Sequence, residues 1–475
     1  MAGQPIQFPT STAPSINPTE NGGRLINAFA EKAPDGGRSA VLIRRAPGLT
    51  PIFTAGVGAY RGSLLVGSVL YIANGALVYT VTEAAGIYTI TALTGALPGT
   101  GLVMMERNMR SPTPQILILH SAGMSQIIAG VVSDFSDADL PSVNSISYLD
   151  SYFFFTSQDG RCFASGVNDV TVAGTDYTTA EASPDGLLRA IPAGSYLLMM
   201  GTATTEFWSD TAQPTGFPFS RSVVIKTGLY GARAVAGHDA GFTSDVCFVG
   251  NDRRAYRLSG FTPTPISTPY IEAMLQAITD SSELEASVYS INGHSCWVLT
   301  SSSWTFVYDL SVGEWHERAS LGTTRWRAEG SVNAFDTWLT FERGSNQVYA
   351  IDPTAKRENA DQLVWEVRSN QAHRFPGRFV VNRASFDMVT GVGNDRGISP
   401  IETDPVVMIS WSDDGGRTFG NPVRRRLGSQ GETTPINING AGLTKQFGRQ
   451  WRLQVADPVE VSLLGGAMDL EARAA

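Results

Sequence analysis

The chain has 475 residues, of which 42% are hydrophobic, and it carries a net charge of −9 from 35 basic and 44 acidic side chains. That length exceeds what one hydrophobic core usually spans, so we expect two or three domains or one large body built from repeats. The negative balance excludes a protein whose overall field draws it onto nucleic acid or an anionic membrane.

Residues 1–50 open the chain with many proline, asparagine and glycine residues and little alternation of apolar and polar positions. This composition predicts an extended N-terminal arm that is ordered by what it packs against.

Residues 51–352 repeat one theme, in which a short apolar strand, a polar turn and a second strand lead into a Thr/Ser/Pro-rich connection. The turns Asn74-Gly75 and Asp159-Gly160 are strong hairpin signals. Five units illustrate the theme: 63–79, 152–163, 247–258, 304–315 and 338–351.

Such units number about six or seven over roughly 300 residues, which is close to the blade length of a β-propeller. We therefore predict an all-β chain with a propeller-like central domain over residues 51–352. A stacked or irregular sandwich stays open, because no fixed-spacing signature marks the blades. Within this region Tyr270–Thr279 has apolar residues at helical spacing and predicts one short connecting helix.

The pattern changes after Asp352, where residues 357–361 form a polar break. Strands then resume with sharper alternation, first at Leu363, Trp365 and Val367 and again from Trp451. We predict that residues 360–475 form a separate C-terminal antiparallel β-sandwich or barrel.

Local signatures of catalysis are missing from the sequence. His316-Glu317 begins like a zinc-protease helix, but position 320 is a serine. No nucleophile elbow and no phosphate-cradling glycine-lysine loop occurs, and the five histidines are scattered. We expect a protein that is not an enzyme, with no catalytic residue, no cofactor and no metal.

An Asp-box-like hairpin follows the apolar strand at Val406–Ile409. Its aspartate is expected to accept backbone N–H bonds across the turn while the aromatic residue tucks beneath, which makes the motif a folding device. Sialidases carry several such boxes in series, with an arginine cluster and a Tyr/Glu pair, whereas this chain has one box outside the predicted propeller. The residues of the motif are Ser412, Asp414, Gly416, Thr418 and Phe419, the last standing where the pattern has tryptophan.

Arg424, Arg425 and Arg426 follow the hairpin, and Arg374, Arg378 and Arg383 precede it. Strand alternation places Arg424 and Arg426 on one face and Arg425 on the opposite face. The three are candidate interface residues for an acidic partner or for passing contact with DNA phosphates; a solvated face is the alternative.

Cys162, Cys247 and Cys296 are far apart and odd in number, which indicates buried reduced thiols rather than disulfides. The N-terminal residues lack a basic region followed by an apolar one, and no stretch approaches the roughly 18 apolar residues of a membrane span. We expect synthesis and folding in a reducing cytoplasm.

Four features together resemble the packaged-DNA stabilisation proteins of short-tailed bacteriophages, also called tail hub or nozzle proteins. They are the opening Arg24–Glu31, the motif Pro47-Gly48-Leu49, the multi-hairpin middle and the hairpin Trp411–Gly416. The resemblance implies a structural part of the virion, made in the host bacterial cytoplasm. It also implies a hexameric ring beneath the dodecameric portal-adaptor, which continues the DNA channel and retains the genome until ejection.

The same resemblance implies docking surfaces for a tail needle, fibres or tailspikes, and a lumen through which double-stranded DNA passes without specific binding. From the charge sum we expect acidic residues to line that lumen, since cationic contacts would brake the passing phosphates. Two other classes stay open: a propeller-type, sialidase-like glycoside hydrolase, and a propeller binding module.

Overall fold

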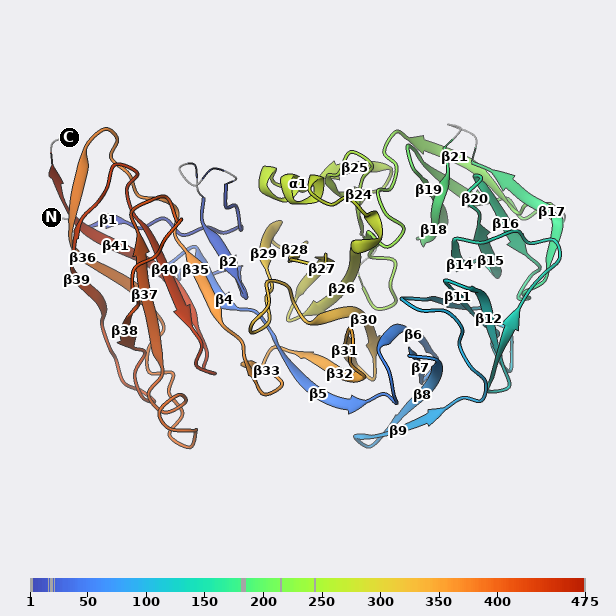
Figure 1. Ribbon diagram of the computed structural model, residues 1–475, viewed down its shortest axis with the longest axis horizontal. Coiled ribbons are helices and arrows are strands. Elements are labelled where there is room, and N and C mark those ends of the chain that lie inside the picture. Colours follow the sequence, from blue (N-terminus) through green and yellow to red (C-terminus); the bar gives the residue numbers. More distant parts are fainter. Residues whose placement is uncertain are drawn as a thin grey trace.

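The computed structural model describes residues 3–15, 17, 20, 22–180, 185–213, 216–242 and 245–473. Figure 1 shows two bodies side by side, a ring of small sheets and a two-layered sandwich. Within the described residues no helix has the length and apolar character needed to span a bilayer.

Seven antiparallel units of four strands form the ring in the described part of the chain, five as separate sheets and two as parts of larger sheets, and we number them blades 1 to 7. The strands are β6 (Tyr60–Val66), β7 (Val69–Asn74), β8 (Leu77–Ala84) and β9 (Ile87–Ala92) in blade 1; β10 (Met104–Arg107), β11 (Ile116–His120), β12 (Gly123–Ile128) and β13 (Val131–Phe135) in blade 2; β14 (Ser145–Leu149), β15 (Tyr152–Thr156), β16 (Arg161–Ser165) and β17 (Val172–Thr179) in blade 3; β18 (Leu187–Ala193), β19 (Tyr196–Gly201), β20 (Thr205–Asp210) and β21 (Phe219–Ile225) in blade 4; β22 (Val235–Ala236), β23 (Val246–Val249), β24 (Ala255–Ser259) and β25 (Thr262–Pro265) in blade 5; β26 (Glu285–Ile291), β27 (His294–Thr300), β28 (Thr305–Asp309) and β29 (Glu314–Glu317) in blade 6; and β30 (Ala328–Ala334), β31 (Thr337–Glu342), β32 (Gln347–Asp352) and β5 (Gly48–Thr54) in blade 7.

The first strand of each blade lies toward the middle of the ring, as β6, β14, β18, β26 and β30 show in Figure 1. β30 of blade 7 contacts β6 of blade 1, which closes the ring. The outer strand of blade 7, β5, comes from the N-terminal part of the chain and pairs with β32, with Leu49 opposite Ile351. The predicted all-β, propeller-like fold is thus confirmed, with seven blades in the described residues.

Burial on both faces of each blade explains why the apolar runs of the sequence are continuous rather than alternating. In β15, Phe153 and Phe155 pack into one core cluster with Leu117 and Leu119 of blade 2. Phe154, on the opposite face, packs into another cluster with residues of blade 4. A strand between two neighbouring blades therefore needs apolar side chains on both sides.

Helix α1 (Pro269–Gln276) connects blades 5 and 6 and ends three residues before the predicted end at Thr279. Thr268 caps the start of the helix, because its side chain accepts a hydrogen bond from the Ile271 N–H. Pro269 occupies the first helical position, where a backbone N–H has no partner within the helix, so the lack of an N–H in proline costs no hydrogen bond. A single 3-10 turn, η2 (Ser281–Glu283), follows it before β26.

Two sheets form the sandwich and enclose a core that contains Trp365, Val367, Trp451 and Leu453. One has the order β3-β4-β41-β36-β39, with β1 also paired to β41, and the other runs β2-β35-β40-β37-β38. The strands are β1 (Gln4–Pro5), β2 (Arg24–Ile26), β3 (Ala28–Lys32), β4 (Val41–Arg45), β35 (Trp365–Arg368), β36 (Arg378–Met388), β37 (Val406–Ser412), β38 (Val423–Arg426), β39 (Ile436–Leu443), β40 (Gln450–Val455) and β41 (Ser462–Arg473); β33 (Arg357–Glu358) and β34 (Asp361–Gln362) extend the sheet of blade 7.

The segment predicted as an extended arm supplies strands to both bodies. β2 pairs in parallel with β29 of blade 6 through Ile26 and Glu317, and antiparallel with β35 of the sandwich through Leu25 and Val367. Blade 6 and one sandwich layer therefore form one continuous sheet of nine strands. The division at residues 1–50, 51–352 and 360–475 stays a prediction.

Candidate functional site

Side-chain and backbone hydrogen bonds hold the turn of the Asp-box-like hairpin. Asp414 accepts bonds from the Thr418 N–H at 2.9 Å and from the Thr418 hydroxyl at 2.5 Å. The Ser412 hydroxyl donates to Asp414 at 2.7 Å and accepts from the Gly416 N–H at 2.9 Å. Gly415 and Gly416 both adopt positive φ, which side chains with a Cβ disfavour. Side chains of the motif therefore close its own turn, as the sequence predicts.

Two arginines cover the aromatic residue of this motif. The guanidinium carbons of Arg452 and Arg368 lie 4.4 Å and 5.2 Å from the ring centroid of Phe419, at cation–π distance. Sequence reasoning missed these partners, because they come from the neighbouring strands β40 and β35.

Asp413 at the same turn makes a second contact that the sequence analysis did not identify. It accepts two hydrogen bonds from the buried guanidinium of Arg449, at 2.8 Å and 2.9 Å. That guanidinium also lies near the rings of Trp411 and Trp451, and it donates a further bond to the Ala441 carbonyl. The turn is therefore anchored to the sandwich core.

We expect Asp414→Asn to lower the free energy of unfolding by roughly 1–2 kcal/mol, because the amide forfeits charge-assisted bonds at a partly solvated turn. Burial raises the pKa of Asp414, but hydrogen bonds from Thr418 and Ser412 outweigh burial and lower it to about 2. The stabilisation is therefore present above about pH 4 and lost as the pH falls through about 2. Denaturant unfolding of wild type and Asp414→Asn between about pH 2 and pH 5 measures this difference in stability.

The exposed loop residue Asp395 supplies the control, since Asp395→Asn removes a carboxylate outside the turn. A stability difference between wild type and Asp414→Asn that stays constant down to pH 2 would contradict the assignment.

Strand β38 places the three predicted interface arginines at one edge of the nine-stranded sheet. Arg424 and Arg426 are exposed, and Arg425 is partly buried with its Nε donating to the Asn437 carbonyl of the opposite layer at 2.7 Å. Arg426 pairs with Asp404 and Glu432. Among the described residues the side chain of Arg424 makes no ion pair and no hydrogen bond. Arg424 therefore differs from Arg425 and Arg426 in being exposed and unpaired.

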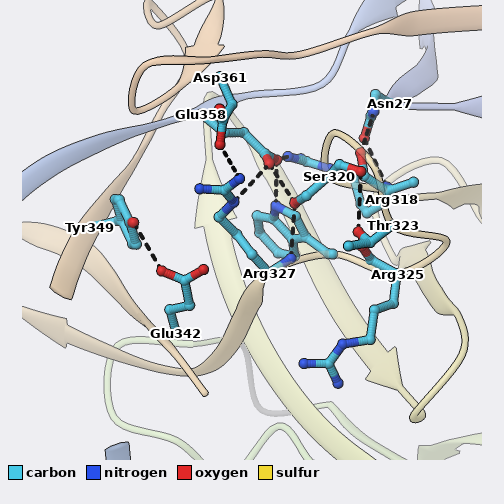
Figure 2. Close-up of polar contacts among 12 residues, drawn as sticks. Asn27, Arg318, Ser320, Thr323, Arg325, Arg327, Glu342, Tyr349, Glu358 and Asp361 are labelled. Atoms are coloured by element: carbon cyan, nitrogen blue, oxygen red, sulfur yellow. Dashed lines mark hydrogen bonds and ion pairs between the residues drawn. The ribbon is translucent and has the colours of Figure 1, made fainter. Parts of the chain in front are cut away.

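A fully buried carboxylate, Glu358, lies where blades 6 and 7 meet the chain that leads to the sandwich. Figure 2 shows contacts from Arg318, Ser320 and Arg327 converging on it. The indole of Trp326 donates to it at 2.7 Å, Ser320 at 2.5 Å and Arg318 at 3.3 Å. We call Glu358 with these four partners the Glu358 cluster.

The Glu358 cluster also reaches the N-terminal segment. Arg318 is buried, donates a second bond to the Pro47 carbonyl at 2.9 Å, and lies 4.1 Å from the ring centroid of Trp326. Arg327 pairs in addition with Asp361. The cluster thus connects three chain segments, which contain Pro47, residues 318–327 and Glu358. Removing one partner of such a buried pair leaves the other charge uncompensated.

The middle of the ring holds a cavity of about 400 Å³ that the first strands of the blades line. It joins a wider vestibule of about 630 Å³ at one mouth, and Tyr60, Arg61, Leu102, Arg233 and Glu285 line both. Ionisable side chains gather here from several blades. They include Arg61, Glu106, Arg189, Arg233, Glu285 and Glu329.

Tyr60 and Tyr148 both line this axial cavity, and Tyr60 lies at the mouth that also includes Glu285; a sialidase-like function would need a reactive tyrosine beside a glutamate. The Tyr60 hydroxyl lies 3.1 Å from that of Ser63, and the Tyr60 ring stacks on Phe341. Burial raises the pKa of Tyr60 above its ordinary value. That shift disfavours the phenolate that nucleophilic attack requires.

The structure places the histidines and cysteines as follows. His294 and His316 both flank the ring of Phe29, and His316 lies on strand β29 rather than on a helix. The described ranges contain no group of three or more His, Cys, Asp or Glu side chains able to hold a metal ion. Cys162, Cys247 and Cys296 are buried and free, and burial raises the pKa of each thiol.

Comparison with known proteins gives one family and several structural neighbours. The family model described as "Bacteriophage P22 Gp10, beta-propeller" matches residues 24–356. The crystal structure of Chaetomium thermophilum Raptor is similar with a TM-score of 0.43 and 9% identity, over 65% of this chain and 29% of that one. The chain therefore spans less than a third of Raptor.

The WD40 domain of Neurospora crassa Pan2 is similar with a TM-score of 0.38 and 10% identity, over 62% of this chain and 89% of that domain. No curated protein matches the sequence.

Proposed function

The chain belongs to the family described as Bacteriophage P22 Gp10, beta-propeller, and on that membership we propose that it is a structural wall subunit of a short phage tail. In this role it forms a ring below the portal-adaptor, continues the DNA channel, retains the packaged genome and supports its ejection. The observation that carries the proposal is the family match over residues 24–356, which spans β2 to β32.

The shape of the propeller supports a DNA path between subunits rather than through one of them. A volume of about 400 Å³ at the ring axis is that of a small-molecule pocket. A double helix, whose major groove alone is about 12 Å wide, needs far more room. A lumen enclosed by several copies, proposed here as a hexamer, satisfies this requirement.

Charge supports passage without strong binding. The net charge of −9 leaves each copy with an excess of carboxylates, and phosphates that meet few cations release few counterions and so bind weakly. Retention of the genome then depends on a constriction or on a plugging partner such as a tail needle. Fibres or tailspikes would dock on the outside of the ring.

The β38 edge is our candidate for a contact surface with an acidic partner, which includes a neighbouring copy or the adaptor. Arg424 carries this assignment, because its guanidinium is exposed and has no partner among the described residues. Arg426, held by Asp404 and Glu432, is already neutralised.

Electron microscopy of the protein mixed with the portal–adaptor complex of the same virus tests the proposal. We expect a ring of six copies on the adaptor, and weaker assembly of Arg424→Glu, since a reversed charge repels an acidic partner. Arg374→Glu, at another exposed arginine, is the matched control.

Failure of the wild type to bind the complex would refute the tail-wall role. Equal assembly of Arg424→Glu and Arg374→Glu would refute only the placement of the contact. Hydrolysis of a fluorogenic sialoside by the purified chain would instead favour the glycosidase class.

A further inference from the structure

The axial cavity contains two arginines that form no ion pair with any residue the structure describes. Arg189 (β18) and Arg233 (the turn before β22) both line it, and neither has a carboxylate oxygen within 4.0 Å. Arg189 donates one bond, to the Ala232 carbonyl at 2.8 Å, and its Nε is buried without a partner. That bond holds the Arg189 guanidinium beside the segment that carries Arg233.

Other buried arginines of this chain have more hydrogen-bond or ion-pair partners. Arg61, at the same cavity, donates to four backbone carbonyls: those of Gly75, Leu97, Pro98 and Gly101. Arg449 binds Asp413, and Arg318 binds Glu358. Arg318 also leaves its Nε and one terminal nitrogen without a hydrogen bond, but it has the Glu358 carboxylate beside it. Within the described residues Arg189 and Arg233 differ from these three in having neither a carboxylate partner nor more than one hydrogen bond.

The acidic side chains of the cavity are largely engaged elsewhere. Glu285 and Glu329 both pair with Arg343, and Glu329 also pairs with Arg325 at 2.6 Å. Asp239 accepts the Gly237 N–H at 3.0 Å. Asp239 and Glu106 are the two carboxyl groups whose charges act on Arg189, and neither lies within ion-pair distance of it among the described residues.

One further polar atom near these arginines lacks a partner. Nδ1 of His238 is buried and makes no hydrogen bond to any residue that the structure describes. Burial is the main reason why the pKa of His238 falls to about 4, so its ring is neutral near pH 7 and can donate or accept one bond. Unpaired donors converging on one cavity are the arrangement that an oxyanion satisfies.

We propose that the axial cavity is a binding site for one small phosphate-type oxyanion, held between the guanidinium groups of Arg189 and Arg233 with His238 alongside. Planar guanidinium forks match the oxygens of such an anion. The vestibule that shares Arg233 with the cavity supplies the entrance. Inorganic phosphate and a nucleotide monophosphate carry the same group. This inference does not depend on the proposed role in the tail.

The full-length chain is titrated with inorganic phosphate and, separately, with a deoxynucleoside 5′-monophosphate, against chloride at matched ionic strength. Calorimetry is expected to give one site per chain, and the midpoint of thermal unfolding is expected to rise by roughly 2–5 °C at saturation. Binding of either probe supports the site, and the tighter probe identifies the source of the group. No binding of either to the wild type overturns the proposal.

Arg189→Met and Arg233→Met are each expected to weaken binding at least about tenfold, because each removes a charge-assisted pair of donors. Arg374→Gln, an exposed arginine outside the cavity, should bind like wild type. Loss of binding in Arg374→Gln, or its persistence in a variant that lacks both cavity arginines, contradicts the assignment. The wild-type titration keeps the test decisive if the double variant does not fold.

Glu106 should make the affinity depend on pH. Burial raises its pKa to about 7; Asp239 also raises it, and Arg189 and Arg107 lower it. Below about pH 7 this carboxyl is neutral, and above it the added negative charge repels an anion. Sulfate keeps its charge over this range, so its affinity should fall several-fold between about pH 6 and pH 8 in wild type and stay level in Glu106→Gln.

Discussion

Replacing Glu358 with alanine is expected to lower the free energy of unfolding by about 3–5 kcal/mol, because the change leaves the guanidinium of Arg318 buried without its carboxylate. Both side chains are 0% exposed, so water cannot take over the lost contact. Trp326 and Ser320 lose their acceptor at the same time. Denaturant unfolding followed by tryptophan fluorescence measures the loss.

Two further variants separate the charge from the contact network. Glu358→Gln keeps a hydrogen-bond acceptor for Trp326 but removes the negative charge. We expect it to lower the free energy of unfolding by about 1–3 kcal/mol. Glu358→Ala combined with Arg318→Met should recover part of the loss, since the unpaired charge is gone. Glu471→Ala is the control, because its pair with Arg473 is on the surface and such pairs contribute about 0–1 kcal/mol. A decrease of less than about 1 kcal/mol in the free energy of unfolding of Glu358→Ala would contradict a stabilising role of the Glu358 cluster.

Removal of residues 1–54 is expected to abolish the folded state rather than to trim an arm. The deletion takes the outer strand from blade 7 and four strands, β1 to β4, from the sandwich layers. It also removes the buried residues Leu25, Ile43, Leu49 and Phe53. Each large apolar side chain lost from a core costs about 2–5 kcal/mol, and four of them approach or exceed the roughly 5–15 kcal/mol that holds a domain together.

Near-ultraviolet circular dichroism and limited proteolysis distinguish a folded from an unfolded product. Deletion of residues 1–5 is the matched control, because it removes only the exposed edge strand β1. A truncated 55–475 chain that unfolds cooperatively at the wild-type midpoint would contradict this prediction.

The propeller could be predicted because its signals are local. Each blade is a run of short apolar strands joined by turns, and hairpin dipeptides such as Asn74-Gly75 lie within one unit. The Asp-box-like turn is equally local, since Ser412 and Thr418 are six positions apart. Helix α1 was found from the spacing of Ile271 and Leu275, but its end was misplaced because Gln276 and Ala277 carry no stop signal.

Contacts between distant segments could not be predicted. Glu358 meets Trp326 and Arg318 across 32 and 40 residues, and no spacing rule links them. The axial cavity takes Glu106 from blade 2, Arg189 from blade 4 and Arg233 from the turn before blade 5, so packing of the blades around one axis brings them together. β2 has three residues, which is too short for period-2 alternation to reveal a strand.

The three residues of β2 have a mechanical consequence. Both of their edges are hydrogen-bonded, to blade 6 on one side and to the sandwich on the other, so the junction lacks the flexible linker that normally lets neighbouring domains swing. The propeller and the sandwich are thus connected through β2 by backbone pairing, with one residue pair on the side of blade 6 and three on the side of the sandwich. If copies assemble as proposed, we expect each to move as one rigid unit, so that opening of the assembly comes from movement between copies rather than from bending within one.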